Sequence, residues 1–281
     1  MSDLHGDTGR YLKLFDLIDQ QRPAAVFLGG DLLPSGIGTI CAVDRQYEDF
    51  VHDFLADQLL ALKEKLGSVY PRIFVVLGND DIRVEEPAIL DAAARGVWHY
   101  AHMNRFDFGP YRVYGYAHTP PSPFQLKDWE RYDVSRYVDP GCVAPTEGRL
   151  TVPVSQRELT YTTIADDLSY LTGEDDLAAA LFLFHAPPYK TDLDRAALDG
   201  QMIDHVPLDL HIGSIAVRRF IEKRQPLVTL HGHVHESARL TGSWREKIGK
   251  TWCFSAAHDG PELALVTFDP ENPEKAERRL L

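Results

Sequence analysis

The sequence predicts an α/β fold, because short apolar runs alternate along the chain with segments of helical periodicity. Four of these runs end in residues that often bind metal ions, and a fifth such group lies near the first residue. In sheets of this kind, functional side chains collect beyond the carboxyl ends of the strands. We therefore expect one site built from five groups: Asp3-Leu4-His5, Gly30-Asp31, Gly78-Asn79-Asp80-Asp81, His185 and Gly232-His233-Val234-His235.

The first part of the chain predicts three helices and three strands. Tyr11, Leu14, Phe15 and Ile18 have the i, i+3, i+4, i+7 spacing of an amphipathic helix. A longer helix of the same type is expected over 47–66, closed by a glycine at position 67. Strands are expected over 24–28, 73–77 and 112–116, and a third helix over 85–94.

Residues 117–153 are predicted to form a long irregular segment, because they contain six prolines. Trp129, Tyr132 and Tyr137 lie between these prolines. Long loops inside a compact domain are usually functional or disordered, and the aromatic content favours an ordered one. We treat 1–281 as a single domain and expect this excursion to lie near the site.

Regular structure is predicted to resume after the excursion. Ser214 is the expected N-cap of one of the helices. The predicted elements are a helix over 157–171, a strand over 181–184, a helix over 214–223, strands over 227–230, 251–254 and 263–268, and a charged, solvated tail over 269–281.

The composition of the chain argues against several classes of function. The chain has 281 residues and a net charge of -13, which disfavours a nucleic-acid partner because such binding depends on Lys and Arg. Cys41, Cys142 and Cys253 fit no zinc motif and are expected to be free thiols in a reducing compartment. With no apolar run near the ~18 residues of a membrane span and no signal peptide, we expect a cytoplasmic protein with no membrane partner.

The five groups offer two Asp, one Asn and four His, which is enough for two metal ions. Divalent ions of hard or borderline character bind this mixture of oxygen and imidazole ligands, and the absence of Cys argues against a structural zinc site. Metal-assisted hydrolysis is thus the leading hypothesis. Only Met1 and Ser2 precede Asp3, so either a first strand lies outside this numbering or the site starts on a nearly free end.

These motifs resemble the calcineurin-like metallophosphoesterase superfamily, whose pattern is DxH, GDxx, GNH with an acid, a lone His, and GHxH. The resemblance implies a four-layer α/β/β/α sandwich of two mixed sheets, with the site between their ends. Further stretches look like the phosphoesterases related to the Icc cyclic-nucleotide phosphodiesterase: Thr119-Pro120-Pro121-Ser122-Pro123-Phe124, Lys127-Asp128-Trp129-Glu130, His185-Ala186-Pro187-Pro188 and His211-Ile212-Gly213-Ser214.

The resemblance also implies a role for each ligand. One ion is held by Asp3, His5, Asp31 and His235, and the other by Asp31, Asn79, His185 and His233, so that Asp31 bridges them. The cofactors implied are two divalent ions of manganese, iron or zinc. Ions ~3.5–4 Å apart can clamp a phosphate and activate a water for in-line attack.

One position departs from the family pattern. The family has a His after the Asn of GNH, thought to protonate the leaving group, whereas this chain has Asp80. A carboxyl group has an unperturbed pKa near ~4 and is a poor acid at neutral pH unless its pKa is raised. His118 and His258 are alternative proton donors, although a structural role is the simpler reading of each.

The sequence thus predicts a dinuclear metal-dependent phosphoesterase that hydrolyses a phosphodiester or a small phosphorylated metabolite. The alternatives are a catalytically weak scaffold of the same fold that binds proteins, and a nuclease. The sequence does not determine the substrate, the metal or the oligomeric state.

Overall fold

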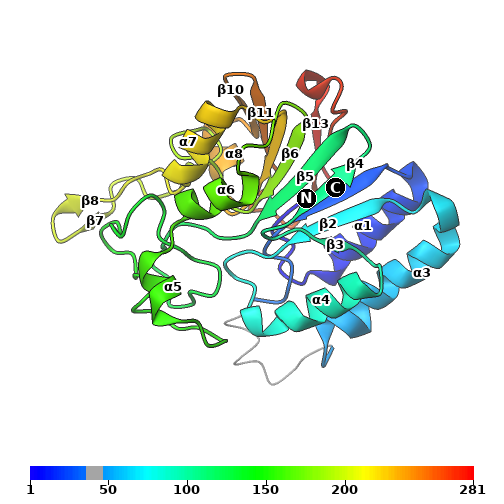
Figure 1. Ribbon diagram of the computed structural model, residues 1–281, viewed down its shortest axis with the longest axis horizontal. Helices are drawn as coiled ribbons and strands as arrows, with labels where there is room; N and C mark the ends of the chain where they lie inside the picture. The colour runs from blue at the N-terminus through cyan, green and yellow to red at the C-terminus, as the bar shows by residue number, and fades with distance from the viewer. Residues whose placement is uncertain (36–46) are drawn as a thin grey trace.

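A computed structural model describes residues 1–35 and 47–281 of the chain. Its first half builds a parallel sheet of β1 (Ala25–Gly29), β2 (Arg72–Val76) and β3 (His99–Tyr100), in that order. The strands predicted over 24–28 and 73–77 are therefore confirmed. Figure 1 shows this sheet with its helices on one side only.

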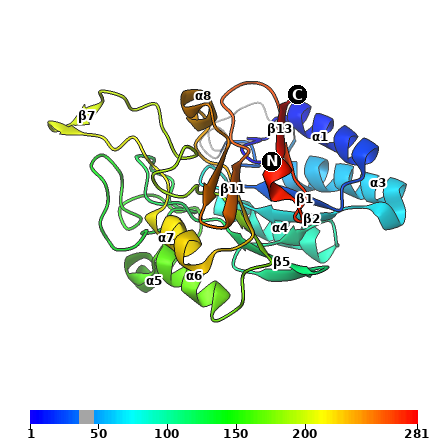
Figure 2. The same cartoon turned by 90° about the horizontal axis from the view of Figure 1, so that it is seen from above.

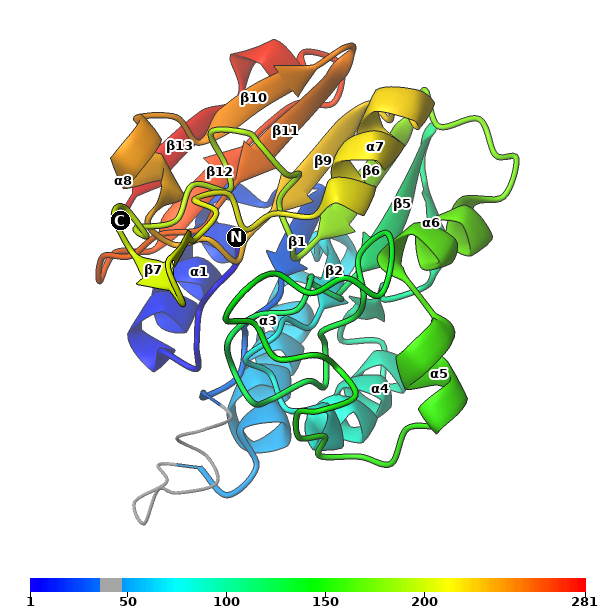
Figure 3. The same ribbon diagram turned by 90° about the vertical axis from the view of Figure 1, so that its left-hand side faces the viewer.

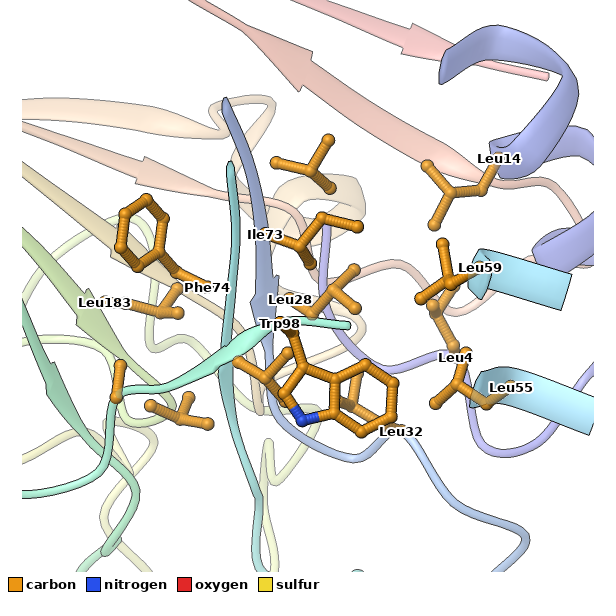
Figure 4. Close-up of a cluster of buried hydrophobic side chains, with 14 of the residues drawn as sticks. Leu4, Leu14, Leu28, Leu32, Leu55, Leu59, Ile73, Phe74, Trp98 and Leu183 are labelled. Carbon is orange, nitrogen blue, oxygen red and sulfur yellow. The ribbon is translucent and has the colours of Figure 1, made fainter. Parts of the chain in front are cut away.

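Those helices pack their apolar stripes onto the sheet. They are α1 (Thr8–Gln21), the π-helix η1 (Val51–Ala56), α3 (Asp57–Leu66) and α4 (Glu86–Ala94). Asp7 caps α1 by accepting the N–H of Arg10, and Gly67 ends α3 with a positive φ of 55°, which glycine adopts without strain. In Figure 4, leucines of α1 and α3 face Leu4, Leu28 and Leu32. The predicted helix over 47–66 begins four residues later and starts in π geometry.

The second sheet has six strands in the order β10-β11-β9-β6-β5-β4. Its four inner strands are parallel, while β10 and β4 are antiparallel edges, so this sheet is mixed and the three-stranded sheet is parallel throughout. The sequence did not predict β4 and β10, because neither strand contains an apolar run. The bounds are β4 (Arg105–Phe108), β5 (Tyr111–Tyr116), β6 (Ala180–Phe184), β9 (Val228–His231), β10 (Arg245–Ile248) and β11 (Thr251–Ser255).

Strand β6 shows how the layers are joined. Successive side chains of a strand point to opposite faces. Leu181 and Leu183 enter the core between the two sheets, and Phe182 and Phe184 enter a second core beneath the outer helices. The result is the α/β/β/α arrangement expected from the resemblance.

The outer helices are α6 (Ile164–Thr172) and α7 (Ile215–Arg224), preceded by the short α5 (Gln156–Tyr161). The single helix predicted over 157–171 is wrong, because the chain is extended at Thr162 and Thr163, and Thr163 starts α6 by accepting the N–H of Asp166. Ser214 is the N-cap of α7, as predicted, and accepts the N–H of Val217.

The carboxyl-terminal tail is mostly exposed, as its charge suggested, but it is also regular. Strand β13 (Glu277–Leu280) pairs antiparallel with β12 (Ala264–Thr267), and the short η4 (Pro273–Lys275) lies between them. Pro273 and Ala276 are buried, so two apolar residues anchor an otherwise charged segment. The small arm of β7 (Met202–Ile203) and β8 (Val206–Pro207) projects from the body (Figure 2).

The excursion over 117–153 is ordered by buried polar contacts. Lys127 and Glu130 form an ion pair with fully buried side chains, and Glu130 also accepts the N–H of Ser122 at 2.7 Å. Because an unpaired buried charge is costly, the two side chains hold one another in place. Of the helices that the structure describes, none has the length and apolar character needed to cross a membrane.

Candidate metal centre

Seven predicted ligands lie at the carboxyl ends of the strands, where the two sheets meet. Asp31 follows β1, Asn79 follows β2 and His185 follows β6 directly. The remaining members are His233 and His235 after β9, and Asp3 and His5 in the segment that runs beside β1.

The donor atoms of these residues follow one another in a closed ring. The separations are Asp3 Oδ1 to His235 Nε2 3.2 Å, His235 Nε2 to His5 Nε2 3.2 Å, His5 Nε2 to Asp31 Oδ2 3.9 Å, Asp31 Oδ2 to His185 Nε2 3.4 Å, His185 Nε2 to Asn79 Oδ1 3.0 Å and Asn79 Oδ1 to His233 Nδ1 2.6 Å. The backbone N–H of His233 closes the ring by donating to Asp3 Oδ1 at 3.0 Å. Residues separated by up to 232 positions thus converge on one spot.

One half of the ring has the geometry of a metal site. Donor atoms of Asp3, His5, Asp31 and His235 all lie within 4.8 Å of one another. Ligands ~2.0–2.2 Å from a common ion are themselves roughly 3–3.6 Å apart, and the separations between neighbours in the ring are close to this. The Oδ2 atom of Asp31 also faces His185, so one carboxylate oxygen lies between both halves of the ring.

The backbone at the ligands is strained. Asp3, His5, Asp31 and His233 have φ values of 58°, 46°, 51° and 74°, in the left-handed region that side-chain-bearing residues seldom adopt. Such strain persists where the surrounding structure enforces it, and it gathers at functional sites. Here the left-handed backbone directs the side chains of these four residues toward one another.

The glycines before the ligands are required by close approach. A Cβ on Gly78 would lie 2.3 Å from Asp31 Oδ1, and one on Gly30 would lie 2.5 Å from His185 Nδ1. Any side chain at either position would push a ligand out of the ring.

The amino-terminal segment is not loose, so Asp3 does not lie on a nearly free end, which was one of the two alternatives that the sequence left open. The N–H of Asp3 donates to Gly30 O at 2.9 Å, and the N–H of His5 donates to Asp31 O at 2.8 Å. Arg10 donates to the carbonyl of Asp3 at 2.9 Å, a contact that no feature of the sequence indicated. The first ligands are therefore held by backbone pairing along the end of β1.

Neighbouring groups orient two of the imidazole rings. Nδ1 of His185 lies 2.8 Å from the Gly29 carbonyl, a contact that makes Nδ1 the donor and leaves Nε2 free to face Asp31 and Asn79. Nδ1 of His5 lies 3.2 Å from Asp80 Oδ2, while Nε2 of His5 faces the ring. Carboxylate and carbonyl partners of this kind fix the tautomer of a ligating His.

The electrostatics favour positive charge at the centre. Burial lowers the pKa of His185, but the Asp31 carboxylate outweighs it and raises that pKa to about 9. Burial and the positive charge of His185 together lower the pKa of His233 to about 3, so this ring is neutral and can donate a lone pair. Burial raises the pKa of Asp31, yet His185 outweighs it and leaves a net lowering. The carboxylates are therefore ionised and attract a cation.

Asp81 links the first two strand ends. It is fully buried and accepts the N–H groups of Leu32, Leu33 and Gly78 at 2.7–3.2 Å. Burial and the nearby Asp31 raise the pKa of Asp81 to about 7.

The proton-donor candidates fall in different surroundings. Asp80 lies beside the ring, where Oδ2 contacts His5 and Oδ1 accepts the hydroxyl of Ser35 at 3.0 Å. His118 is buried among His102, Tyr116 and Trp129, and burial followed by the charge of Arg131 lowers the pKa of His118 far below its ordinary value. A ring that stays neutral is a poor acid, so this placement favours a structural role for His118.

His258, the other alternative donor, contacts Glu262 at 2.9 Å, four residues along the chain. Cys142 and Cys253 are free thiols, as expected, while Cys41 lies outside the described residues.

Comparisons with known proteins agree with this geometry. Residues 1–237 match the model of the calcineurin-like phosphoesterase family. A search of curated protein sequences finds no match. Among solved structures, the chain is similar to TT1561 of Thermus thermophilus, with 18% identity, a TM-score of 0.53 and coverage of 100% of this chain and 96% of that one.

It is also similar to the phosphopantetheinyl hydrolase PptH from Mycobacterium tuberculosis, with 13% identity, a TM-score of 0.50 and coverage of 92% and 88%. Likeness at these identities shows the shared fold.

Proposed function

The chain belongs to the calcineurin-like phosphoesterase family, and from this premise we propose a dinuclear phosphodiesterase that acts on small phosphorylated molecules. The observation that carries the proposal is the closed ring of seven donor residues, with one oxygen of Asp31 between its two halves. A protein used only as a scaffold has no physical reason to keep these donors converged on strained backbone.

In this proposal Asp3, His5, Asp31 and His235 hold one ion, and Asp31, Asn79, His185 and His233 hold the other. Manganese, iron and zinc all suit this donor set of imidazole and oxygen atoms. Two bound ions would supply Lewis-acid activation of the phosphoryl group and of the attacking water. The neutral oxygen of Asn79 limits the negative charge around the second ion.

Asp80 has two candidate roles in this reaction. The sequence suggested a general acid, while the contact with His5 suits a residue that positions a ligand. A centre without a strong acid suits substrates whose leaving group departs easily, which is one reason to propose diesters with good leaving groups.

The excursion over 117–153 is proposed to shape the substrate pocket. Asp128 accepts the N–H of Arg83 at 2.8 Å, and Thr151 accepts the N–H of Val84 at 3.0 Å. The guanidinium of Arg83 also stacks over Trp129, 5.2 Å from the ring centroid. Because Arg83 and Val84 follow Asp81 closely, these contacts tie the excursion to the Asn79 loop. The free thiols suit a reducing, cytoplasmic setting.

The test combines metal analysis with substrate hydrolysis. Metal-free protein is titrated with Mn²⁺, Fe²⁺ and Zn²⁺, and rates are measured on bis(4-nitrophenyl) phosphate and 4-nitrophenyl phosphate. We expect two ions per chain and faster hydrolysis of the diester. A stoichiometry of one, or activity that persists in the metal-free protein, would overturn the proposed mechanism.

A further inference from the structure

Asp194 and His211 form a carboxylate–imidazole pair outside the ring of metal ligands. Nδ1 of His211 lies 2.7 Å from Asp194 Oδ1, and the side chain of Asp194 is fully buried. The same carboxylate accepts the backbone N–H groups of Lys190, Thr191 and Gly213 at 2.9–3.1 Å. Backbone groups thus fix the carboxylate, and the carboxylate in turn fixes the imidazole.

The ring of His211 is held in one orientation and keeps one nitrogen available. Because a carboxylate only accepts hydrogen bonds, Nδ1 is the donor in this pair. The ring of Tyr189 meets that of His211 edge-on with the centroids 6.3 Å apart, and Asp209 accepts the backbone N–H of His211 at 2.9 Å. The side chain of His211 is 30% exposed, and among the described residues no hydrogen bond occupies Nε2. This outer nitrogen can therefore contact a bound molecule.

One side of the His211 segment is tied to the loop that carries His235. His211 pairs antiparallel with Arg195. Two residues after Arg195, the N–H of Ala197 donates to the side chain of Glu236 at 2.9 Å. Glu236 directly follows the ligand His235, so these contacts place the His211 segment next to one edge of the metal centre.

The other side of the segment is tied to the loop that carries His185. The N–H of Ser214 donates to the carbonyl of Pro187 at 2.8 Å, and Pro187 lies two residues after the ligand His185. Figure 3 shows the segment around β7 and the excursion on the same side of the molecule, in front of the strands. His211 is thus held between the loops of His185 and His235.

The metal centre is open to solvent on the side of His235. The side chains of His5 and His235 are 28% and 34% exposed, whereas Asp31 and His185 are buried. A substrate must therefore reach the centre from the side on which the partly exposed ligands lie, and the segment of His211 borders that side.

We propose, on the basis of the function proposed above, that Nε2 of His211 donates a hydrogen bond to a phosphoryl oxygen of the bound substrate. Asp194 is the positioning residue of this contact. An imidazolium carries an N–H on each nitrogen, so it can donate to the Asp194 carboxylate through Nδ1 and to an anion through Nε2. Hydrogen bonds between charged partners are roughly twice as strong as neutral ones, and the alternation of carboxylate, imidazolium and phosphoryl group gives two of them.

Two substitutions at His211 separate contact with the substrate from a structural role. The amide nitrogen of Asn can take the place of Nδ1, so His211→Asn keeps the hydrogen bond to Asp194 and loses only the outer nitrogen. His211→Ala removes both. His205→Asn is the matched control, because His205 is exposed at the turn of the β7–β8 arm and its φ of 67° is one that Asn tolerates.

The measurements are the Kd of inorganic phosphate for the Mn²⁺-loaded proteins, KM for bis(4-nitrophenyl) phosphate, metal stoichiometry and Tm. We expect His211→Asn to raise Kd and KM about tenfold or more, the loss typical of a hydrogen bond to a charged group, without a change in stoichiometry or Tm. His211→Ala should raise both constants as much and also lower Tm. A His211→Asn protein with the Kd and KM of the wild type would overturn the proposal, because the retained bond to Asp194 would then account for the whole role of His211.

Nuclear magnetic resonance of the ¹⁵N-labelled imidazoles gives a second readout that needs no variant. Phosphate should shift the Nε2 resonance of His211 and leave that of His205 unchanged, and the absence of a shift would overturn the contact even if His211→Asn fails to fold. A wild-type protein that binds two ions and hydrolyses the diester, combined with an unshifted His211, refutes this contact alone. A wild-type protein that does neither refutes the proposed function and the contact together.

Discussion

The two sheets contribute different chemistry to the metal centre. The three-stranded sheet and the segment beside it supply every oxygen donor, from Asp3, Asp31 and Asn79, together with His5. The six-stranded sheet supplies only imidazoles, from His185, His233 and His235. Neither sheet alone brings together the donors of either proposed ion, so the centre depends on the packing between them.

The two sheets also differ in the charge of the side chains that they supply. Negative charge comes from the first sheet, and two imidazoles of the second sheet, those of His185 and His235, lie against it. One oxygen of Asp31 faces both His5 and His185, so the ligands from the two sheets meet at this atom. Substitutions where the two sheets meet should therefore reduce activity and metal binding more than substitutions elsewhere in either sheet.

The largest effect is expected for Asp31→Asn, which removes the charge shared by both halves. Activity should fall by more than the roughly 10–100-fold loss typical of outer-shell partners, because both ions lose a ligand. The measurements are kcat/KM and metal stoichiometry. Asp16→Asn, an exposed change on α1, is the matched control. Near-normal turnover of Asp31→Asn would place the chemistry elsewhere.

The next effect is expected for Leu183→Ala in the core between the sheets. Truncating a buried Leu costs about 2–5 kcal/mol of unfolding free energy, including the cavity left behind. Metal affinity should weaken along with stability, because the two donor sets are held by this packing. Urea unfolding with and without metal checks both, and Leu12→Ala on the exposed face of α1 is the control. Unchanged metal affinity in a destabilised Leu183→Ala protein would separate the site from the sheet contact.

A smaller effect is expected at Asp80, where a positioning role and an acid role make different predictions. As a positioning residue, Asp80→Ala should weaken metal binding about 10–100-fold and lower aryl and alkyl diester rates equally. As an acid, it should slow alkyl substrates selectively. Asp80→His should narrow the gap between aryl and alkyl substrates, because imidazole titrates near neutral pH. Equal leaving-group sensitivity before and after Asp80→His would exclude the acid role.

The smallest effect is expected at His52, on the surface of the first half and away from the site. Hydrogen bonds with Asp49 at 2.6 Å and Asp91 at 3.1 Å raise the pKa of His52 above its ordinary value. A raised folded-state pKa adds stability below pH ~6.5, and this stability is lost as pH rises through the raised pKa.

The contribution of His52 should stay under about 1 kcal/mol, because the group is partly exposed and screened by solvent. His52→Gln should therefore lower the unfolding free energy more at pH 5.5 than at pH 9. Denaturant titrations at both pH values measure the difference. An equal loss at both values would mean that folding does not change the pKa of His52.

The sequence alone determined the fold class and the identity of the converging residues. Both are local properties: a β-branched run such as 73–77 predicts a strand wherever it lies, and Asn79 directly after it must sit at that strand's end. The amphipathic stripe of α1 and the cap at Ser214 were predictable for the same reason.

Other features depended on contacts between distant segments, which no local pattern encodes. Charge predicted the exposure of the tail, but it did not predict that the tail pairs with β12 as a strand. The sequence offered both Asp80 and His118 as candidate acids. Tertiary structure buries His118 among aromatic rings and places Asp80 against His5. A cavity of about 310 Å³ beside β1 likewise exists only after α1, the six-stranded sheet and β12 have packed around that strand, because its walls come from both ends of the chain.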